Sequence, residues 1–236
     1  MSNKIKIFKI GNDYLNKYHV RSKGIFESVL TSSDVTSPYY CSDNEYQSEF
    51  TGIRDILDRT DLGTFDFLGI CHYRTLIGYI NPSMEYDSAL DESELIINKS
   101  LESGVQGIRS TAIDRGHNYP NRIARARWVG SKSLDYISDA LFSKYPSLCA
   151  PWIKYNNESD NSYRVVNVLP SSAFVDVFSL VTSLAPILTE YRRSDGTLVD
   201  RSVGYDLETL TSFMLVLMSD KLKLDKIQHT ILNIKN

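Results

Sequence analysis

The sequence predicts an α/β fold with one domain over residues 1–236, in which helices cover both faces of a sheet. Its 236 residues are enough to bury one sizeable core without disulfides. Strand-like segments alternate with helical ones, and no repeat, low-complexity tract or linker divides the chain. Residues 65–71 are almost continuously apolar, which is typical of a central strand buried on both sides.

The first elements in chain order are a strand, a loop and a helix. Residues 5–10 alternate apolar and polar side chains and then meet a turn at residues 11–13, which predicts a strand. Residues 31–44 are rich in loop formers. We expect a helix after them, capped by Asp43 or Asn44, because apolar residues recur there at helical spacing up to about residue 60.

The central strand at residues 65–71 leads directly into His72, Tyr73 and Arg74. In open α/β sheets, ligands bind beyond the carboxyl ends of the strands. These three side chains are therefore well placed to meet a ligand.

The second half continues the alternation of helices and strands. Pro186 should kink or split one of its helices, and residues 114–120, which include His117, have the composition of a loop. We expect these elements: a strand or extended loop over 76–82, helix 91–101, strand 104–113, helix 121–144, strand 163–169, helix 174–191, helix 205–217, and after residue 220 either an amphipathic helix or an edge strand.

The charge balance argues against nucleic acid as a partner. The chain has 26 Lys and Arg against 29 Asp and Glu, a net charge of −3, whereas nucleic-acid binding needs a clustered excess of cations. The 3 cysteines are far apart and form neither a disulfide framework nor a zinc motif. A reducing, cytoplasmic location is expected.

The expected location extends to the inner face of the plasma membrane. No stretch reads as a signal peptide or reaches the length of a membrane span. Lys221, Lys223 and Lys226 allow a peripheral contact with anionic lipid, although a solvent-exposed face is the preferred interpretation. The sequence does not define an oligomeric state.

Four blocks of the sequence, in order, resemble a bacterial glycosyltransferase family of capsule, exopolysaccharide and O-antigen gene clusters. The most specific is DFLGICHYR, which is similar to the family hallmark G-x-x-H-Y-R. The blocks are SPYY with YQSEFTG (residues 37–40 and 46–52), DFLGICHYR (66–74), the segment from Asn167 to Glu190, and RSVGYDLETL (201–210).

The resemblance implies a GT-A-like nucleotide-binding sheet and transfer of galactofuranose from UDP-galactofuranose. The acceptor would be a growing bacterial surface polysaccharide or a lipid-linked glycan. The chain departs from the family at residues 11–13, where a His-Lys pair is usual, and at Thr75 and Thr209, where the family has arginines. These departures affect the expected donor sugar more than the family.

A glycosyltransferase must stabilise a departing nucleoside diphosphate and deprotonate an acceptor hydroxyl. Many such enzymes use an Asp-x-Asp turn with a divalent metal where this chain has His72, Tyr73 and Arg74. We expect Arg74, with His72, to replace the metal, because a guanidinium binds phosphate oxygens in a bidentate manner and keeps its charge. A metal-independent enzyme is favoured, although Mg²⁺ and Mn²⁺ stay open.

Four carboxylates are candidates for the general base: Glu49 on an expected helix, Glu208 near the start of another, Asp206, and more weakly Asp66. His117 is the candidate acceptor contact. With the resemblance, the candidate catalytic residues are Glu49, His72, Arg74 and Glu208, and the candidate donor-binding residues are Asp66, Tyr73, Asn167, Arg201 and Tyr205.

Structural roles compete with each of these assignments. His72 can be a buried histidine bonded to the backbone, Arg74 can pair with Glu49 or Asp66, and Arg201 can pair with Glu208. A catalytically degenerate binding or scaffold subunit of a polysaccharide assembly complex is the alternative function. A metal-dependent hydrolase is disfavoured because the 4 histidines lack ligand spacing.

Overall fold

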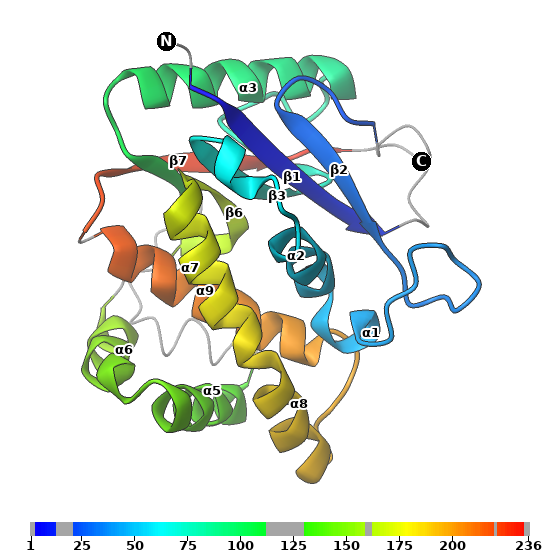
Figure 1. Ribbon diagram of the computed structural model, residues 1–236, viewed down its shortest axis with the longest axis vertical. Helices are drawn as coiled ribbons and strands as arrows, with labels where there is room; N and C mark the ends of the chain where they lie inside the picture. Colours follow the sequence, from blue (N-terminus) through cyan, green and yellow to red (C-terminus); the bar gives the residue numbers. More distant parts are fainter. Residues whose placement is uncertain (1–2, 13–20, 112–129, 159–161, 220, 234–236) are drawn as a thin grey trace.

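The computed structural model describes residues 3–12, 21–111, 130–158, 162–219 and 221–233. Within these residues the strands are hydrogen-bonded in the order β2-β1-β3-β4-β7-β5-β6, and β3 also pairs with β6 (Figure 1). Their bounds are β1 Ile5–Asn12, β2 Phe26–Thr31, β3 Phe67–His72, β4 Thr75–Ile77, β5 Gly107–Thr111, β6 Ser162–Pro170 and β7 Leu224–Ile231.

One half of the sheet is parallel. β1 lies between β2 and β3, and Ile10 near its end pairs with His72 at the end of β3. The carboxyl ends of these strands therefore share one edge of the sheet. This is the edge at which the sequence predicts a ligand site.

The other half closes the sheet into a small barrel. β6 runs antiparallel to both β3 and β5, and β5 runs parallel to β7. The short strand β4 then pairs antiparallel with β7 on one side and with the end of β3 on the other. The expectation of an open, GT-A-like sheet is thus only partly met: the fold is mixed α/β, but β4 returns the hydrogen bonding to β3.

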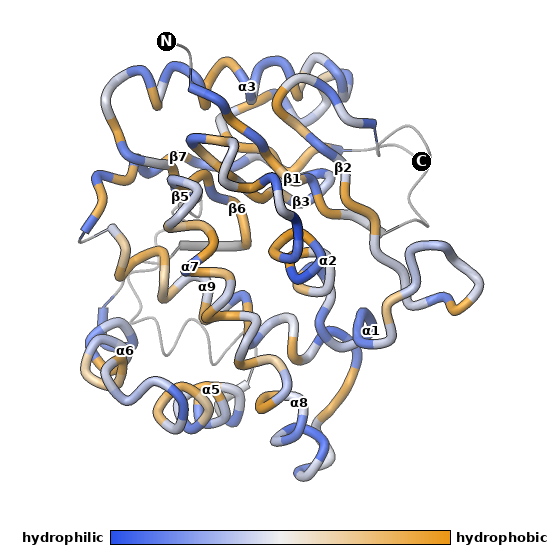
Figure 2. The backbone as a smooth tube through the Cα atoms, viewed as in Figure 1, coloured by the Kyte–Doolittle hydropathy of each residue, from blue (hydrophilic) through white to orange (hydrophobic). Residues whose placement is uncertain are grey.

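Helices lie on both faces of this sheet, as the sequence predicts. α3 packs on one face, against β1 and β5, while α2, α7 and α9 pack on the other, with α5, α6 and α8 outside them (Figure 1). Alternation along the strands separates the two cores: Ile5 and Ile7 of β1 face α3, and Phe8 and Ile10 face the larger helical layer. Apolar segments accordingly run through the interior in Figure 2.

The helix bounds correct several sequence expectations. The helices and 3-10 turns are α1 Asn44–Gln47, α2 Glu49–Leu57, η1 Leu62–Thr64, α3 Tyr86–Glu102, α5 Ser131–Lys144, η2 Pro146–Leu148, α6 Cys149–Asn157, α7 Ser171–Ser183, α8 Ala185–Ser194 and α9 Ser202–Ser219. α3 starts before the expected residue 91 because the Glu85 side chain caps it, accepting a hydrogen bond from the Ser88 amide. Pro186 does split its helix, between α7 and α8.

The chain after residue 220 resolves the alternative left by the sequence. It forms a strand, β7, but not the expected edge strand, because β7 pairs with β4 on one side and with β5 on the other. By length and composition, residues 171–194 could cross a membrane. In this structure Val177, Phe178 and Val181 of that segment are fully buried in the core, which accounts for their apolar character.

Candidate active site

His72 occupies the carboxyl end of β3, on the sheet face that carries α2 and α9. Leu68 and Ile70, which precede it on the same face, are fully buried in the larger core and fix the strand. The imidazole is about three-quarters buried, with 23% of its side chain exposed. Gly69 of the same block serves packing, since a Cβ there would lie 2.5 Å from the Asn167 carbonyl oxygen on β6.

Glu49 lies beside His72, although the two residues come from separate elements. It is the first residue of α2, and its Oε1 lies 3.4 Å from His72 Nε2. The same oxygen accepts a hydrogen bond from Arg201 Nη2 at 3.4 Å. Burial works to raise the pKa of Glu49, but His72, the Ser48 hydroxyl and Arg201 outweigh it and hold that pKa below its ordinary value.

A strained junction brings Glu49 and Arg201 together. Ser48 has φ 53° and ψ −130°, and Arg201 has φ 58°, conformations that non-glycine residues rarely adopt. The Arg201 amide donates to the Glu45 carbonyl oxygen at 2.7 Å. Backbone strain of this kind persists where the surroundings over-determine it, and functional sites are common places for it.

Gly204 allows α9 to approach this junction closely. A Cβ at Gly204 would lie 3.1 Å from both the Gln47 carbonyl oxygen and Ser48 Cβ. The start of α9 is thus pressed against the link between α1 and α2. The glycine of the RSVGY block has a packing role that its sequence did not reveal.

Arg74 lies at the turn from β3 to β4 and is exposed. Among the described residues no carboxylate forms an ion pair with its guanidinium, so the competing structural pairing with Glu49 or Asp66 is not seen there. Its nearest aromatic partner is Tyr73, with the guanidinium carbon 5.9 Å from the ring centre. The Arg74 cation is therefore exposed to solvent, two residues after His72 in the chain.

The structure separates one predicted residue, Asp66, from this cluster. Asp66 precedes β3, at the opposite end of that strand from His72, and its carboxylate accepts a hydrogen bond from the Lys4 amide at 2.8 Å. It is part of the amino edge of the sheet. His117 lies outside the described residues.

Three further candidates lie on the same side of the sheet as His72. Tyr205 is half-buried on α9, with the Arg201 guanidinium carbon 5.6 Å from its ring centre. Glu208 is also half-buried, one helical turn further along the same face of α9. Asn167 is fully buried in β6.

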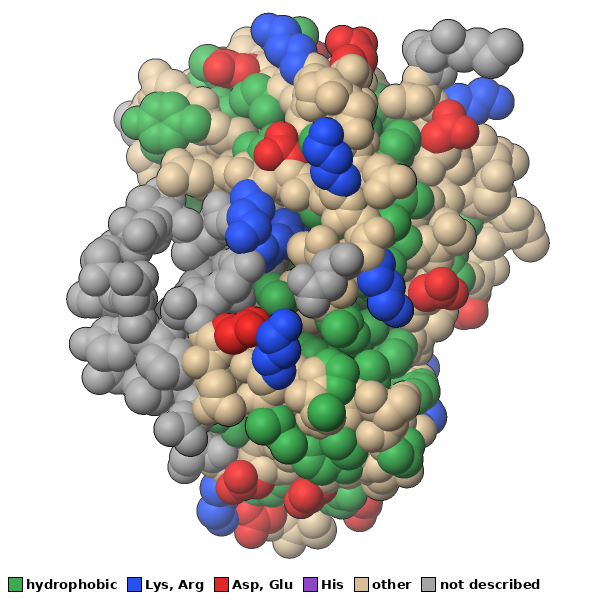
Figure 3. All heavy atoms as spheres, turned by 90° about the vertical axis from the view of Figure 1, so that its left-hand side faces the viewer, with side chains coloured by type: hydrophobic (Ala, Val, Ile, Leu, Met, Phe, Trp, Pro, Cys, Tyr) green, Lys and Arg blue, Asp and Glu red, His purple; other side chains and the backbone are tan. Residues whose placement is uncertain are grey.

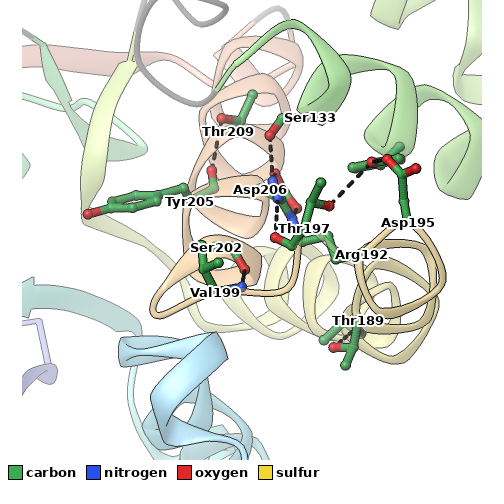
Figure 4. A network of polar contacts seen from close by, with 12 residues as sticks. Ser133, Thr189, Arg192, Asp195, Thr197, Val199, Ser202, Tyr205, Asp206 and Thr209 are labelled. Atoms are coloured by element: carbon green, nitrogen blue, oxygen red, sulfur yellow. Dashed lines mark hydrogen bonds and ion pairs between the residues drawn. The ribbon is translucent and has the colours of Figure 1, made fainter.

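Asp206, another of the four candidate bases, has a structural role instead. Its carboxylate forms a buried ion pair with Arg192, which also donates to the Ser133 hydroxyl (Figure 4). In the same view Tyr205 points away from this network, toward the other side of α9. Asp206 therefore joins α8, α9 and α5 and is not available to a substrate at His72.

The described residues offer no metal-binding cluster. No group of 3 or more His, Cys, Asp or Glu among them could hold a metal ion.

Figure 3 shows hydrophobic side chains gathered over α6 and the end of α9, near several lysines and arginines. A shallow hollow there is lined by Pro151, Lys154, Tyr155, Glu158, Phe213, Val216 and Leu217.

Ser48 is the site residue that sequence reasoning missed. Its place before the acidic start of α2 suggests an ordinary N-cap, yet it makes no cap hydrogen bond and instead bonds Glu49. Its unusual backbone lies against Gly204 of α9, which is distant in the sequence. No local pattern could have revealed it.

The fold, a mixed α/β sheet with helices on both faces, is similar to that of a solved glycosyltransferase. The solved structure that carries this likeness is described as the bifunctional glycosyltransferase WbbM in its apo form, with a TM-score of 0.71 and 15% sequence identity. The match covers 98% of this chain and 46% of that one, so this chain spans less than half the length of its neighbour. No family model and no curated protein matches the sequence.

Proposed function

We propose that this chain is a glycosyltransferase that moves a hexose from a nucleotide-sugar donor onto a glycan acceptor. The observation that carries the proposal is the convergence of Glu49, His72 and Arg201 at the carboxyl edge of the sheet. These residues belong to three of the four blocks or their flanks, and Arg74 lies exposed beside them. The structural likeness to a glycosyltransferase supports the same role.

His72 is the residue we assign to the acceptor proton. Glu49 already contacts His72 and the Arg201 cation and has a lowered pKa, which makes its carboxylate a weak base. It is better suited to orient His72 and to stabilise the imidazolium that forms when His72 takes a proton, as the acid does in catalytic triads. Glu208 is the second candidate base, and it lies on the face of α9 that also carries Tyr205.

Arg74 and Arg201 are the cations we assign to the leaving diphosphate. In the transfer, the bond between the sugar anomeric carbon and the phosphate oxygen breaks, and that oxygen keeps the electron pair. The acceptor oxygen bonds to the anomeric carbon and gives its proton to His72. Fixed positive charge aimed at the departing diphosphate is the kind of electrostatic help that gives large rate gains.

UDP-galactofuranose is the donor we propose, and a bacterial surface polysaccharide or lipid-linked glycan the acceptor. Support for these finer points comes from the four sequence blocks. Tyr73, Tyr205 and Asn167 are the proposed further donor contacts. Action in the cytoplasm, at the inner face of the membrane, and independence of metal belong to the same proposal.

A transfer assay with a panel of nucleotide sugars tests this function. Purified protein, with EDTA in excess, should release nucleoside diphosphate and form a glycosylated acceptor, and the His72→Ala variant should not. Complete loss of activity in EDTA that added Mn²⁺ restores would contradict the metal-free mechanism. Absence of transfer from every donor, with and without metal, would contradict the enzyme itself.

A binding or scaffold subunit is the second candidate, and the position of Thr75 favours it. This residue stands where the family hallmark continues with an arginine, and it is fully buried in β4 opposite His72. The site therefore has one cation fewer than the family pattern. Tight binding of a nucleotide sugar without turnover would identify this second role.

A further inference from the structure

A buried asparagine, Asn167, lies on the same face of the sheet as His72, on a neighbouring strand. Asn167 of β6 pairs with Ile70 of β3, and His72 is two residues further along β3. Val166 and Val168 face α3, so Asn167 points to the opposite, His72-bearing face. Side chains in this diagonal relation across two strands are about 7–8 Å apart.

The amide of Asn167 lacks the partners that its burial requires. No part of the residue is exposed, and neither Nδ2 nor Oδ1 has a hydrogen-bond partner among the residues that the structure describes. Buried amides are almost always paired, because leaving one without a partner is costly. A leucine or valine would fill a purely structural position at lower cost, so the amide indicates a polar group that binds there.

Arg109 lies next to Asn167 and adds a fixed positive charge. It pairs with Asn167 across β5 and β6, which puts both side chains on the same face, and it too is fully buried. A guanidinium keeps its charge when buried and suits phosphate oxygens. An amide donor and acceptor beside a cation match an anionic oxygen that adjoins a hydroxyl or N–H group.

We propose that Asn167 and Arg109 form the inner end of the donor site and bind a phosphate oxygen and an adjoining hydroxyl of the nucleotide sugar. Asn167 Nδ2 donates to the phosphate oxygen, Oδ1 accepts from the hydroxyl, and Arg109 supplies charge. This inference rests on the proposed transferase function and adds Arg109 to it. Because both residues are fully buried, the donor must displace the side chains that cover them.

Calorimetric titration with UDP, GDP, ADP and inorganic pyrophosphate tests the subsite. For the compound that the wild type binds, Asn167→Leu should weaken affinity at least tenfold, while the melting temperature without ligand is unchanged or higher. Leu169→Met, on the same face of β6, is the matched control and should bind like the wild type. Asn167→Asp should also bind that compound at least tenfold more weakly than the wild type. It replaces Asn167→Leu as the test variant if the leucine variant does not fold.

Two results would overturn the proposal. The first is affinity within twofold of the wild type in Asn167→Leu or Asn167→Asp. The second is equal loss in the Leu169→Met control, which would indicate a packing effect. If His72→Ala loses transfer while Asn167→Leu binds the nucleotide normally, the proposed subsite is wrong and the transferase function stands. If the wild type neither binds a nucleotide nor transfers sugar from any donor, both proposals are wrong.

Discussion

Arg192 and Asp206 form a bidentate ion pair that is almost completely buried. Nε lies 2.6 Å from Oδ2 and Nη2 lies 2.7 Å from Oδ1. Burial raises the pKa of Asp206, and the contact with Arg192 opposes that rise. The pair links α8 to α9, the helix that carries the candidates Tyr205 and Glu208.

Removing one partner of this pair should destabilise the fold strongly. Arg192→Met leaves the Asp206 carboxylate buried without its cation, which typically costs about 3–5 kcal/mol. Urea unfolding should show this loss. Glu190→Gln breaks an exposed pair with Arg193 and is the matched control, with an expected change below about 1 kcal/mol. Equal effects of the two changes would contradict the structural role.

Glu49 should make stability depend on pH in the acid range. Its pKa in the folded chain is lowered, so its stabilising contribution is complete above the ordinary pKa and is lost as pH falls through the folded value. Unfolding free energies of the wild type and Glu49→Gln should therefore converge as pH falls below about 4.3. A difference that stays constant over the acid range would show that the carboxylate charge is not responsible.

Ser48→Gly separates backbone strain from the side-chain contact. Glycine adopts positive φ at little cost, so the fold should keep its stability or gain up to about 1 kcal/mol. Loss of the hydroxyl that bonds Glu49 should raise the pKa of Glu49, so the pH below which its stabilising contribution is lost in urea unfolding should move upward. An unchanged pH profile would exclude Ser48 as a positioning residue.

Gly204→Ala is the complementary change at the same junction. The added methyl would lie 3.1 Å from Ser48 Cβ and from the Gln47 carbonyl oxygen, and overpacking of this kind costs about 1–3 kcal/mol. Thermal unfolding should show the loss. The variant should also transfer more slowly, because displacement of α9 moves Arg201 away from Glu49. Stability equal to the wild type would contradict the close approach.

Arg74→Ala should abolish transfer without loss of stability. The side chain is exposed and, among the described residues, has no carboxylate partner. Surface substitutions of this kind usually change stability by less than about 0.5 kcal/mol. Arg74→Lys should keep part of the activity, since it keeps the charge and loses the bidentate geometry. Near-normal turnover of Arg74→Ala would contradict its assignment to the diphosphate.

Lys9 should make stability rise with pH in the alkaline range. It is buried against Tyr86, and burial lowers its pKa to about 8, although Cys71 and Asp87 oppose that effect. Between this value and the unfolded value of about 10.4, the unfolded chain binds more protons, so stability increases with pH. Lys9→Met should remove that slope in unfolding experiments from pH 8 to 10.5. A slope equal to the wild type would contradict the lowered pKa.

The central strand and the residues after it could be predicted from the sequence, because local periodicity and turn residues define them. Closure of the sheet could not, since it depends on pairing of Thr75 with Ile231, and no local pattern encodes such a distant contact. The positions of Asp66 and Asp206 away from His72 could not be predicted for a related reason. The sequence gives their chemistry but not which end of a strand or which neighbouring helix they face.

The pairing of β4 with β7 also has a consequence for the order in which the protein forms. The carbonyl oxygen of Arg74 accepts a hydrogen bond from the amide of Leu232 at 2.8 Å. The turn that carries Arg74 is therefore held by a hydrogen bond from Leu232, far along the chain from Arg74. During synthesis from the amino end, this hydrogen bond cannot form until Leu232 has left the ribosome, so the turn is completed long after its own residues are made.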